Sequence, residues 1–195
     1  MIHQPHLLDR FIHGKTALFV AFVWGLAEAT LFFIVPDVLL TLSGCRSLRA
    51  GLKAGCAAIL GALLGGCIMY AAGSHAPEPS RALLIHVPGI HPQLVELVQT
   101  QLSQRGLSAV LFGPARGIPY KIYAVEWGAR HGNLPGFLLI SIPGRGIRFL
   151  LSALLATAVA RLITPWTQHR ASVEITVWAL FWIGFYTFYF HHWGW

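Results

Sequence analysis

The chain has 195 residues, of which 55% are hydrophobic and only 11% are charged. A soluble domain of this length needs more charge to cover its surface, so the composition excludes an ordinary soluble protein and indicates an integral membrane protein. The formal net charge is +7. We attribute it to loops that face anionic lipid headgroups rather than to nucleic-acid binding, because no basic block is interleaved with aromatic residues.

The first apolar segment extends from about residue 16 to 43, and it is broken by Glu28 and by Pro36-Asp37. Backbone that leaves helical geometry at membrane depth cannot face lipid, because its N–H and C=O groups would have no hydrogen-bond partners. The break therefore predicts a hairpin whose tip is enclosed by protein or by a hydrated pocket.

The second apolar segment runs from Leu48 to Gly73, and its glycines recur at a spacing of four residues, which lets helices approach one another closely. A polar linker follows from residue 74 to 105, and its prolines predict that it begins as a loop. After Pro92 the apolar side chains fall on one helical face, which predicts a short amphipathic helix. This helix either lies on the membrane surface or packs on the protein itself.

The third apolar segment runs from Gly106 to about Trp127, the fourth from Leu134 to Ile163 and the fifth from Val173 to Phe190. The fourth is interrupted around Pro143, whereas the fifth is continuous. The third has Gly and Pro breaks like those of the first, which predicts a second hairpin. The residues that we expect to form the hairpin tips are Pro36, Gly113, Gly117 and Pro119.

The same order thus occurs twice: a broken apolar segment is followed by an apolar helix, which is rich in small residues in the first half and longer in the second. We expect an all-α integral membrane protein in which two re-entrant hairpins and transmembrane helices form an inverted repeat. Its single domain consists of a first half at 16–73, the linker at 74–105, a second half at 106–163 and a C-terminal transmembrane helix at 173–192. Paired, interrupted segments at matching positions in two halves are typical of a transporter site.

The distribution of positive charge bears on the topology. Re-entrant hairpins put seven cations on one side, namely Arg10, Lys15, Arg46, Arg49, Lys53, Arg161 and Arg170, and three on the other, namely Arg81, Arg105 and Arg130. Two spanning segments would instead give six against four. Because positive charge gathers on the cytoplasmic side, the count favours re-entrant hairpins with the N-terminus inside.

Charged residues within the apolar segments are the candidate substrate-binding residues: Glu28, Asp37, Arg116, Lys121, Arg145 and Arg148. A charge at bilayer depth costs about 2.5–3.5 kcal/mol, so these side chains should face one another or a watery cavity. They either form ion pairs that hold the hairpins together or surround a guest. The excess of cations favours an anionic guest, and the planar fork of Arg suits phosphate.

Within this set we expect Arg116 and Lys121 to hold a phosphate, with Arg145 and Arg148 nearby. Glu28 and Asp37 are protonatable partners that would either couple proton movement or release the headgroup. The cysteines and histidines lack the spacing of metal ligands, and no nucleophile elbow occurs. We therefore expect no metal, no cofactor and no catalytic residue.

Three motifs resemble the DedA family, also called the SNARE-associated or VTT-domain superfamily. They are Glu28 with Pro36-Asp37, the stretch Gly61-Ala62-Leu63-Leu64-Gly65 followed by Tyr70 and Gly73, and Arg116-Gly117-Ile118-Pro119. The resemblance covers residues 16 to 165. Family members commonly have Pro-Gly-Glu where this chain has Pro-Asp, and a second Arg where it has Ile122, with Lys121 adjacent. The chain therefore resembles a divergent, short branch.

The resemblance implies lipid handling, because relatives are linked to the flipping of polyprenyl-phosphate carriers or phospholipids and to lipid scrambling. It also implies a multi-pass location in the bacterial inner membrane and two hairpins that meet at the bilayer centre. We expect a transporter, flippase or scramblase for a phosphate-bearing lipid, with membrane lipids as its partners. The alternatives are a membrane-embedded enzyme that acts on lipid phosphates and a non-catalytic assembly factor.

Overall fold

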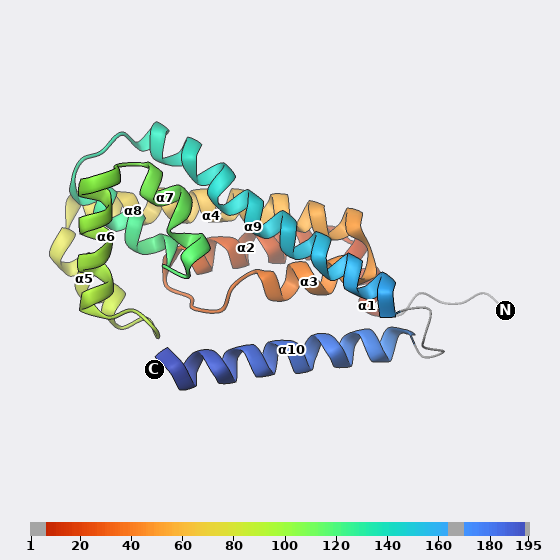
Figure 1. Cartoon of the computed structure of the whole chain (residues 1–195). Coiled ribbons are helices and arrows are strands. Elements are labelled where there is room, and N and C mark those ends of the chain that lie inside the picture. The colour runs from red at the N-terminus through yellow and green to blue at the C-terminus, as the bar shows by residue number, and fades with distance from the viewer. Residues whose placement is uncertain (1–6, 164–169, 194–195) are drawn as a thin grey trace.

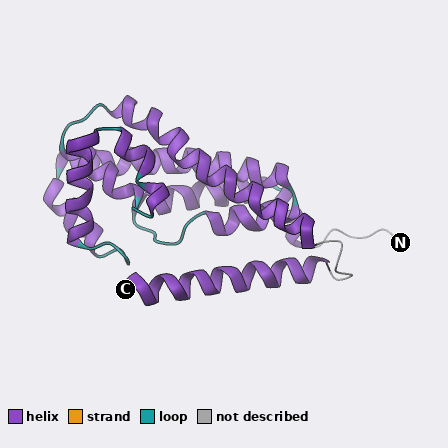
Figure 2. Ribbon diagram, viewed as in Figure 1, coloured by secondary structure: helices purple, strands orange, loops and turns teal. Residues whose placement is uncertain are grey.

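The computed structural model describes residues 7–163 and 170–193, and every regular element in these ranges is a helix (Figures 1 and 2). The prediction of an all-α chain is confirmed. Three of the described helices are long and apolar enough to cross a membrane: α4 (Leu48–His75), α9 (Leu134–Ile163) and α10 (Arg170–Trp193). These helices support a membrane-embedded protein.

The other elements are shorter. They are α1 (Leu7–His13), α2 (Lys15–Thr30), α3 (Asp37–Arg46), α5 (Pro77–Ile85), α6 (Pro92–Arg105), α7 (Ser108–Phe112), the 3₁₀ turn η1 (Pro114–Arg116) and α8 (Tyr120–Ala129). The breaks expected in the first and third apolar segments thus occur, between α2 and α3 and between α7 and α8.

The chain reverses direction between α2 and α3 (Figure 1). Arg46, in the last turn of α3, donates hydrogen bonds of 2.7 and 2.9 Å to the two carboxylate oxygens of Asp9 in α1. Because α1 leads directly into α2, this ion pair holds the start of α2 and the end of α3 at the same end of the molecule.

A second reversal occurs between α7 and α8. Gly117 has a φ of +83°, in the left-handed region that side-chain-bearing residues avoid, so a glycine suits this turn. After α8, Arg130 donates hydrogen bonds to the carbonyl of Gln99 (2.7 Å) and to the hydroxyl of Ser103 (3.0 Å). Both acceptors belong to α6, which immediately precedes α7, so the chain returns close to the point where this reversal began.

α4 is the central helix, since α2, α3, α8 and α9 all pack against it. A Cβ atom at Gly61 would overlap the carbonyl group of Phe22 in α2, and one at Gly73 would overlap that of Val125 in α8. Glycine therefore lets the backbones of these helices touch. The close approach that the glycine spacing predicted for α4 is confirmed.

Two expectations about prolines are wrong. α9 continues through Pro143 instead of being interrupted there, because one proline removes a single backbone hydrogen bond, which a long packed helix tolerates. The linker begins as helix α5 rather than as a loop, because Pro77 occupies the first turn, where its missing N–H has no intrahelical partner to lose.

The amphipathic helix after Pro92 is α6, and it packs on the protein. Val95, Val98 and Leu102 are all buried in the same apolar cluster as Val110 and Tyr123 from the second half. Of the two alternatives left open by the sequence, the structure therefore supports packing on the protein for this face of the helix.

We expect Gly61→Ala to lower the free energy of unfolding by about 1–3 kcal/mol, because the added methyl group would push α2 away from α4. Gly184→Ala in α10 is the matched control, since no atom lies within 4 Å of its would-be Cβ. Titration of the purified protein from mild detergent into dodecyl sulfate measures both. Equal stability of the two variants would show that α2 and α4 are not in backbone contact.

Candidate functional site

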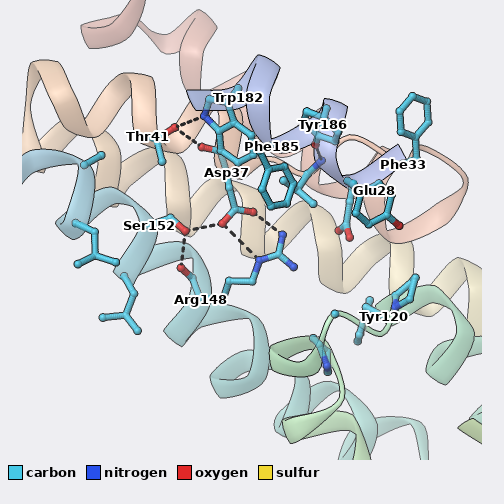
Figure 3. Close-up of a pocket in the computed structure, with 18 of the residues that line it drawn as sticks. Glu28, Phe33, Asp37, Thr41, Tyr120, Arg148, Ser152, Trp182, Phe185 and Tyr186 are labelled. Atoms are coloured by element: carbon cyan, nitrogen blue, oxygen red, sulfur yellow. Dashed lines mark hydrogen bonds and ion pairs between the residues drawn. The ribbon is translucent and has the colours of Figure 1, made fainter. Parts of the chain in front are cut away.

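A cavity of about 1040 Å³ lies between α10 and the faces of α3 and α9 (Figure 3). Its wall on α9 is a stripe of apolar side chains at four-residue spacing: Ile147, Leu151, Leu155 and Val159. Its wall on α10 is aromatic, with Trp178, Phe181, Trp182, Phe185, Tyr186 and Tyr189. Most of the lining is therefore suited to hydrocarbon.

Asp37 is the first residue of α3 and lies on the cavity wall. Its carboxylate accepts hydrogen bonds of 2.5 Å from Arg148 Nη2 and 2.5 Å from Ser152 Oγ (Figure 3). Arg148 and Ser152 are one turn apart on α9 and also line the cavity. This ion pair therefore joins the first broken segment to a helix of the second half.

Glu28 of α2 forms a second ion pair with Arg145, one turn before Arg148 on α9. The guanidinium carbon of Arg145 lies 4.8 Å from the ring centroids of both Tyr120 and Phe149, so the cation is held between two aromatic faces. Glu28 lines the cavity, whereas Arg145 does not. Arg145 therefore acts as the counter-ion of Glu28 behind the cavity wall.

Lys121, the second residue of α8, is only 2% exposed and lines the cavity. Its ammonium donates a 2.8 Å hydrogen bond to the carbonyl of Phe32, at the tip of the first reversal. The tips of the two reversals thus meet at this residue. An ammonium has three N–H donors, and no carboxylate among the described residues forms an ion pair with Lys121.

Arg116 is not brought to the cavity. Its side chain is exposed at the end of η1, and it is not among the lining residues, although the following residues Gly117, Ile118 and Pro119 are. The left-handed turn at Gly117 separates Arg116 from the start of α8. The structure thus gathers Glu28, Asp37, Lys121 and Arg148 at the cavity, with Arg145 behind them and Arg116 outside.

The expected hairpin residues lie at the reversals. Pro36 immediately precedes α3, and Pro119 immediately precedes α8. The first turns of both helices therefore begin at the cavity wall. Gly113 separates α7 from η1, and a Cβ there would overlap the ring of Tyr123. Helix N-termini carry partial positive charge, so two such ends favour an anion in this cavity.

A polar stripe on α3 was not among the sequence predictions. Asp37, Thr41 and Cys45 recur every four residues and all line the cavity. Thr41 Oγ1 accepts a hydrogen bond of 3.0 Å from Trp182 (Figure 3). It accepts another of 3.1 Å from Trp178. The four-residue spacing after Pro36 is visible in the sequence and is the signal that would have identified the stripe.

Glu126 is fully buried, but it belongs to a different cluster. Both of its carboxylate oxygens accept hydrogen bonds from Arg81 of α5, at 2.7 and 2.9 Å. These hydrogen bonds raise the pKa of Arg81 above its ordinary value. The Arg81–Glu126 ion pair holds the linker against α8, away from the cavity. Among the described residues, no group of three His, Cys, Asp or Glu side chains is placed to hold a metal ion.

We expect Glu28→Gln to lower the free energy of unfolding by about 3–5 kcal/mol, because it leaves Arg145 charged and buried without its counter-ion. The double variant Glu28→Gln, Arg145→Gln removes the unpaired charge and should recover most of this loss. Unfolding in mixed micelles, followed by circular dichroism, measures the three chains. Strictly additive losses would show that the two side chains do not interact.

No family model, no curated protein and no solved structure matches this chain.

Proposed function

We propose that the protein moves a lipid with an anionic, phosphate-type headgroup across the membrane, as a transporter, flippase or scramblase. The observation that carries this proposal is Lys121, a buried ammonium without a carboxylate partner among the described residues, in a cavity with apolar and aromatic walls. The ammonium of such a site suits a charged headgroup, and its apolar and aromatic walls suit hydrocarbon chains.

The chemistry of the walls favours an amphipathic guest. A fully polar solute would lose hydrogen bonds to water against Leu151, Leu155 and the rings of α10, at a cost of several kcal/mol. A pure hydrocarbon would instead cover the charged Asp37–Arg148 pair without offering it a partner. A lipid satisfies both parts of the surface at once.

The charge of the site favours an anionic headgroup. Around Lys121, Glu28 is matched by Arg145 and Asp37 by Arg148, so Lys121 leaves this inner cluster with one unmatched positive charge. The third acid on the cavity wall, Glu174, lies outside this cluster and is bound by Arg46. The N-termini of α3 and α8 add partial positive charge at the same place. Arg148 retains N–H donors that Asp37 does not use, and these suit a phosphate oxygen.

We further propose that the two reversals are re-entrant hairpins of an inverted repeat, with the N-terminus inside a bacterial inner membrane. The contact between Lys121 and Phe32 supports tips that meet within the bilayer. On this basis the chain would be a divergent member of the DedA family, in which Glu28 and Asp37 exchange protons with the substrate path.

The stripe of Asp37, Thr41 and Cys45 supplies a route for the headgroup. It leads along α3 from the Asp37–Arg148 pair towards the end of the molecule where Arg46 binds Asp9. The indoles of Trp178 and Trp182 are bonded to Thr41 half-way along this route. We propose that these bonds must open for a headgroup to pass.

We expect Lys121→Met to reduce the rate of lipid movement in reconstituted liposomes by roughly 10- to 100-fold, the value of one charged hydrogen-bond partner. Lys121→Arg keeps the charge and should retain most of the rate. Lys15→Met, which removes an exposed cation, is the matched control. Movement of a labelled phospholipid to the outer leaflet is read by dithionite quenching. Chemical turnover of the lipid would instead indicate an enzyme. If the lipid is neither moved nor chemically changed, the result would indicate an assembly factor.

We expect Thr41→Val to increase the rate at which a water-soluble maleimide alkylates Cys45, by about two- to tenfold. The physical reason is that the indole of Trp182 loses its acceptor, a hydrogen bond worth about 0.5–1.5 kcal/mol, whereas Trp178 keeps a 3.0 Å hydrogen bond to the carbonyl of Val38. Thr41→Ser retains the acceptor and should match the parent. Both are made in a chain in which Cys56 and Cys67 are replaced by serine. Identical alkylation rates for the Val and Ser variants at position 41 would contradict the proposal that these hydrogen bonds close the route.

A further inference from the structure

A second groove lies on the outer side of α4, away from the transport cavity. It has a volume of about 790 Å³ and is lined by Leu18, Leu48, Arg49, Leu52, Lys53, Cys56, Ala57 and Leu60. Only Leu18 comes from α2, so the groove is the seam between α2 and the first half of α4. The proposed transport does not involve these residues.

The groove has a polar end and an apolar end. Arg49, Lys53, Cys56 and Leu60 follow one another at spacings of three or four residues, so they form one line along the helix. The two cations come first, close to the start of α4 at Leu48. The apolar part then follows towards the middle of the spanning helix, where Leu60 is 61% exposed.

The two cations have no internal partner among the described residues. Both Arg49 and Lys53 are exposed, and no hydrogen bond or ion pair joins either one to another side chain there. Their neighbour Arg46 differs, because it binds both Asp9 and Glu174. The acids at this end of the molecule are thus already used by Arg46.

The length of the groove matches one leaflet. From Arg49 to Leu60 the helix rises by about 16 Å at ~1.5 Å per residue, and half of a hydrocarbon core measures roughly 15 Å. A lipid with its headgroup at Arg49 and Lys53 would therefore place its acyl chain along Cys56 and Leu60. This is the orientation that a lipid already has in a bilayer.

We propose that this groove binds an anionic phospholipid of the leaflet at the Arg46 end, with its phosphate bridging Arg49 and Lys53. Charge complementarity selects this occupant over a zwitterionic lipid or an apolar helix of another protein, neither of which satisfies two unpaired cations. The site goes beyond the proposed transport and does not depend on it.

The test is lipid binding to the purified full chain in detergent, with Cys45 and Cys67 replaced by serine so that Cys56 is the reporting thiol. Phosphatidylglycerol and phosphatidylcholine with identical acyl chains are titrated. Binding is read by protection of Cys56 from alkylation and by native mass spectrometry of bound lipid. We expect protection by phosphatidylglycerol at much lower concentration, and loss of this selectivity as salt is raised.

The decisive variant is Arg49→Gln, Lys53→Gln, which should weaken binding of phosphatidylglycerol roughly 30-fold, since each cation near an anionic lipid contributes about 1 kcal/mol. Arg10→Gln, Lys15→Gln is the matched control, because it removes the same charge from exposed positions at the same end of the molecule. Its affinity should stay close to that of the parent.

Three results would overturn the proposal. Equal protection by both lipids would show that the groove accepts any chain or an apolar partner. Equal weakening in both double variants would assign the effect to diffuse surface charge rather than to the groove. Competition by inorganic phosphate at the same concentration as the lipid would show an anion site that does not recognise the acyl chain.

Discussion

The ion pairs Glu28–Arg145 and Asp37–Arg148 join α2 and α3 to a single stretch of α9, and the arrangement of the two halves depends on them. Each acid is in the first half of the chain and each arginine is in the second. Neither half supplies partners for these four charges, so breaking the pairs would leave charged groups buried without a partner, which is strongly unfavourable. The pairs therefore define how the first reversal sits against α9.

Buried ion pairs are an inefficient way to obtain stability, because apolar side chains of similar volume often stabilise a protein as well or better. Glycine packing already holds the halves together, since Gly44 of α3 meets the backbone of Ala153 in α9 and Gly73 of α4 meets that of Val125 in α8. The charged residues are thus not needed for cohesion alone. Glu28, Asp37 and Arg148 lie on a cavity wall, beside an ammonium that forms no ion pair with a described carboxylate, and the guest that we propose would account for this position.

The sequence predicted the helical class, the breaks at Pro36 and at 113–119, and the charges that gather at the cavity, because hydrocarbon forbids unpaired backbone and isolated charge. It could not predict side-chain direction. Arg116 and Lys121 are five residues apart, yet the left-handed turn at Gly117 leaves Arg116 exposed while Lys121 is buried. An interruption was wrongly predicted at Pro143, because a local sequence pattern does not reveal the packing that keeps α9 continuous.

The two lipid sites that we propose hold their cations at different places along the bound lipid, and this difference favours different roles for them. In the groove on α4 the cations Arg49 and Lys53 lie at the rim, so a bound lipid keeps its headgroup at the interface and its chain in the core. In the cavity the cation without an ion pair is Lys121, at the meeting point of the two reversals, and in the proposed membrane placement a headgroup would reach it only by leaving the interface. The groove therefore suits a lipid at rest, whereas the cavity suits a lipid in transit. Hydrocarbon opposes such a displacement of charge, and we propose that the α3 stripe, with two helix N-termini at its inner end, offsets this opposition.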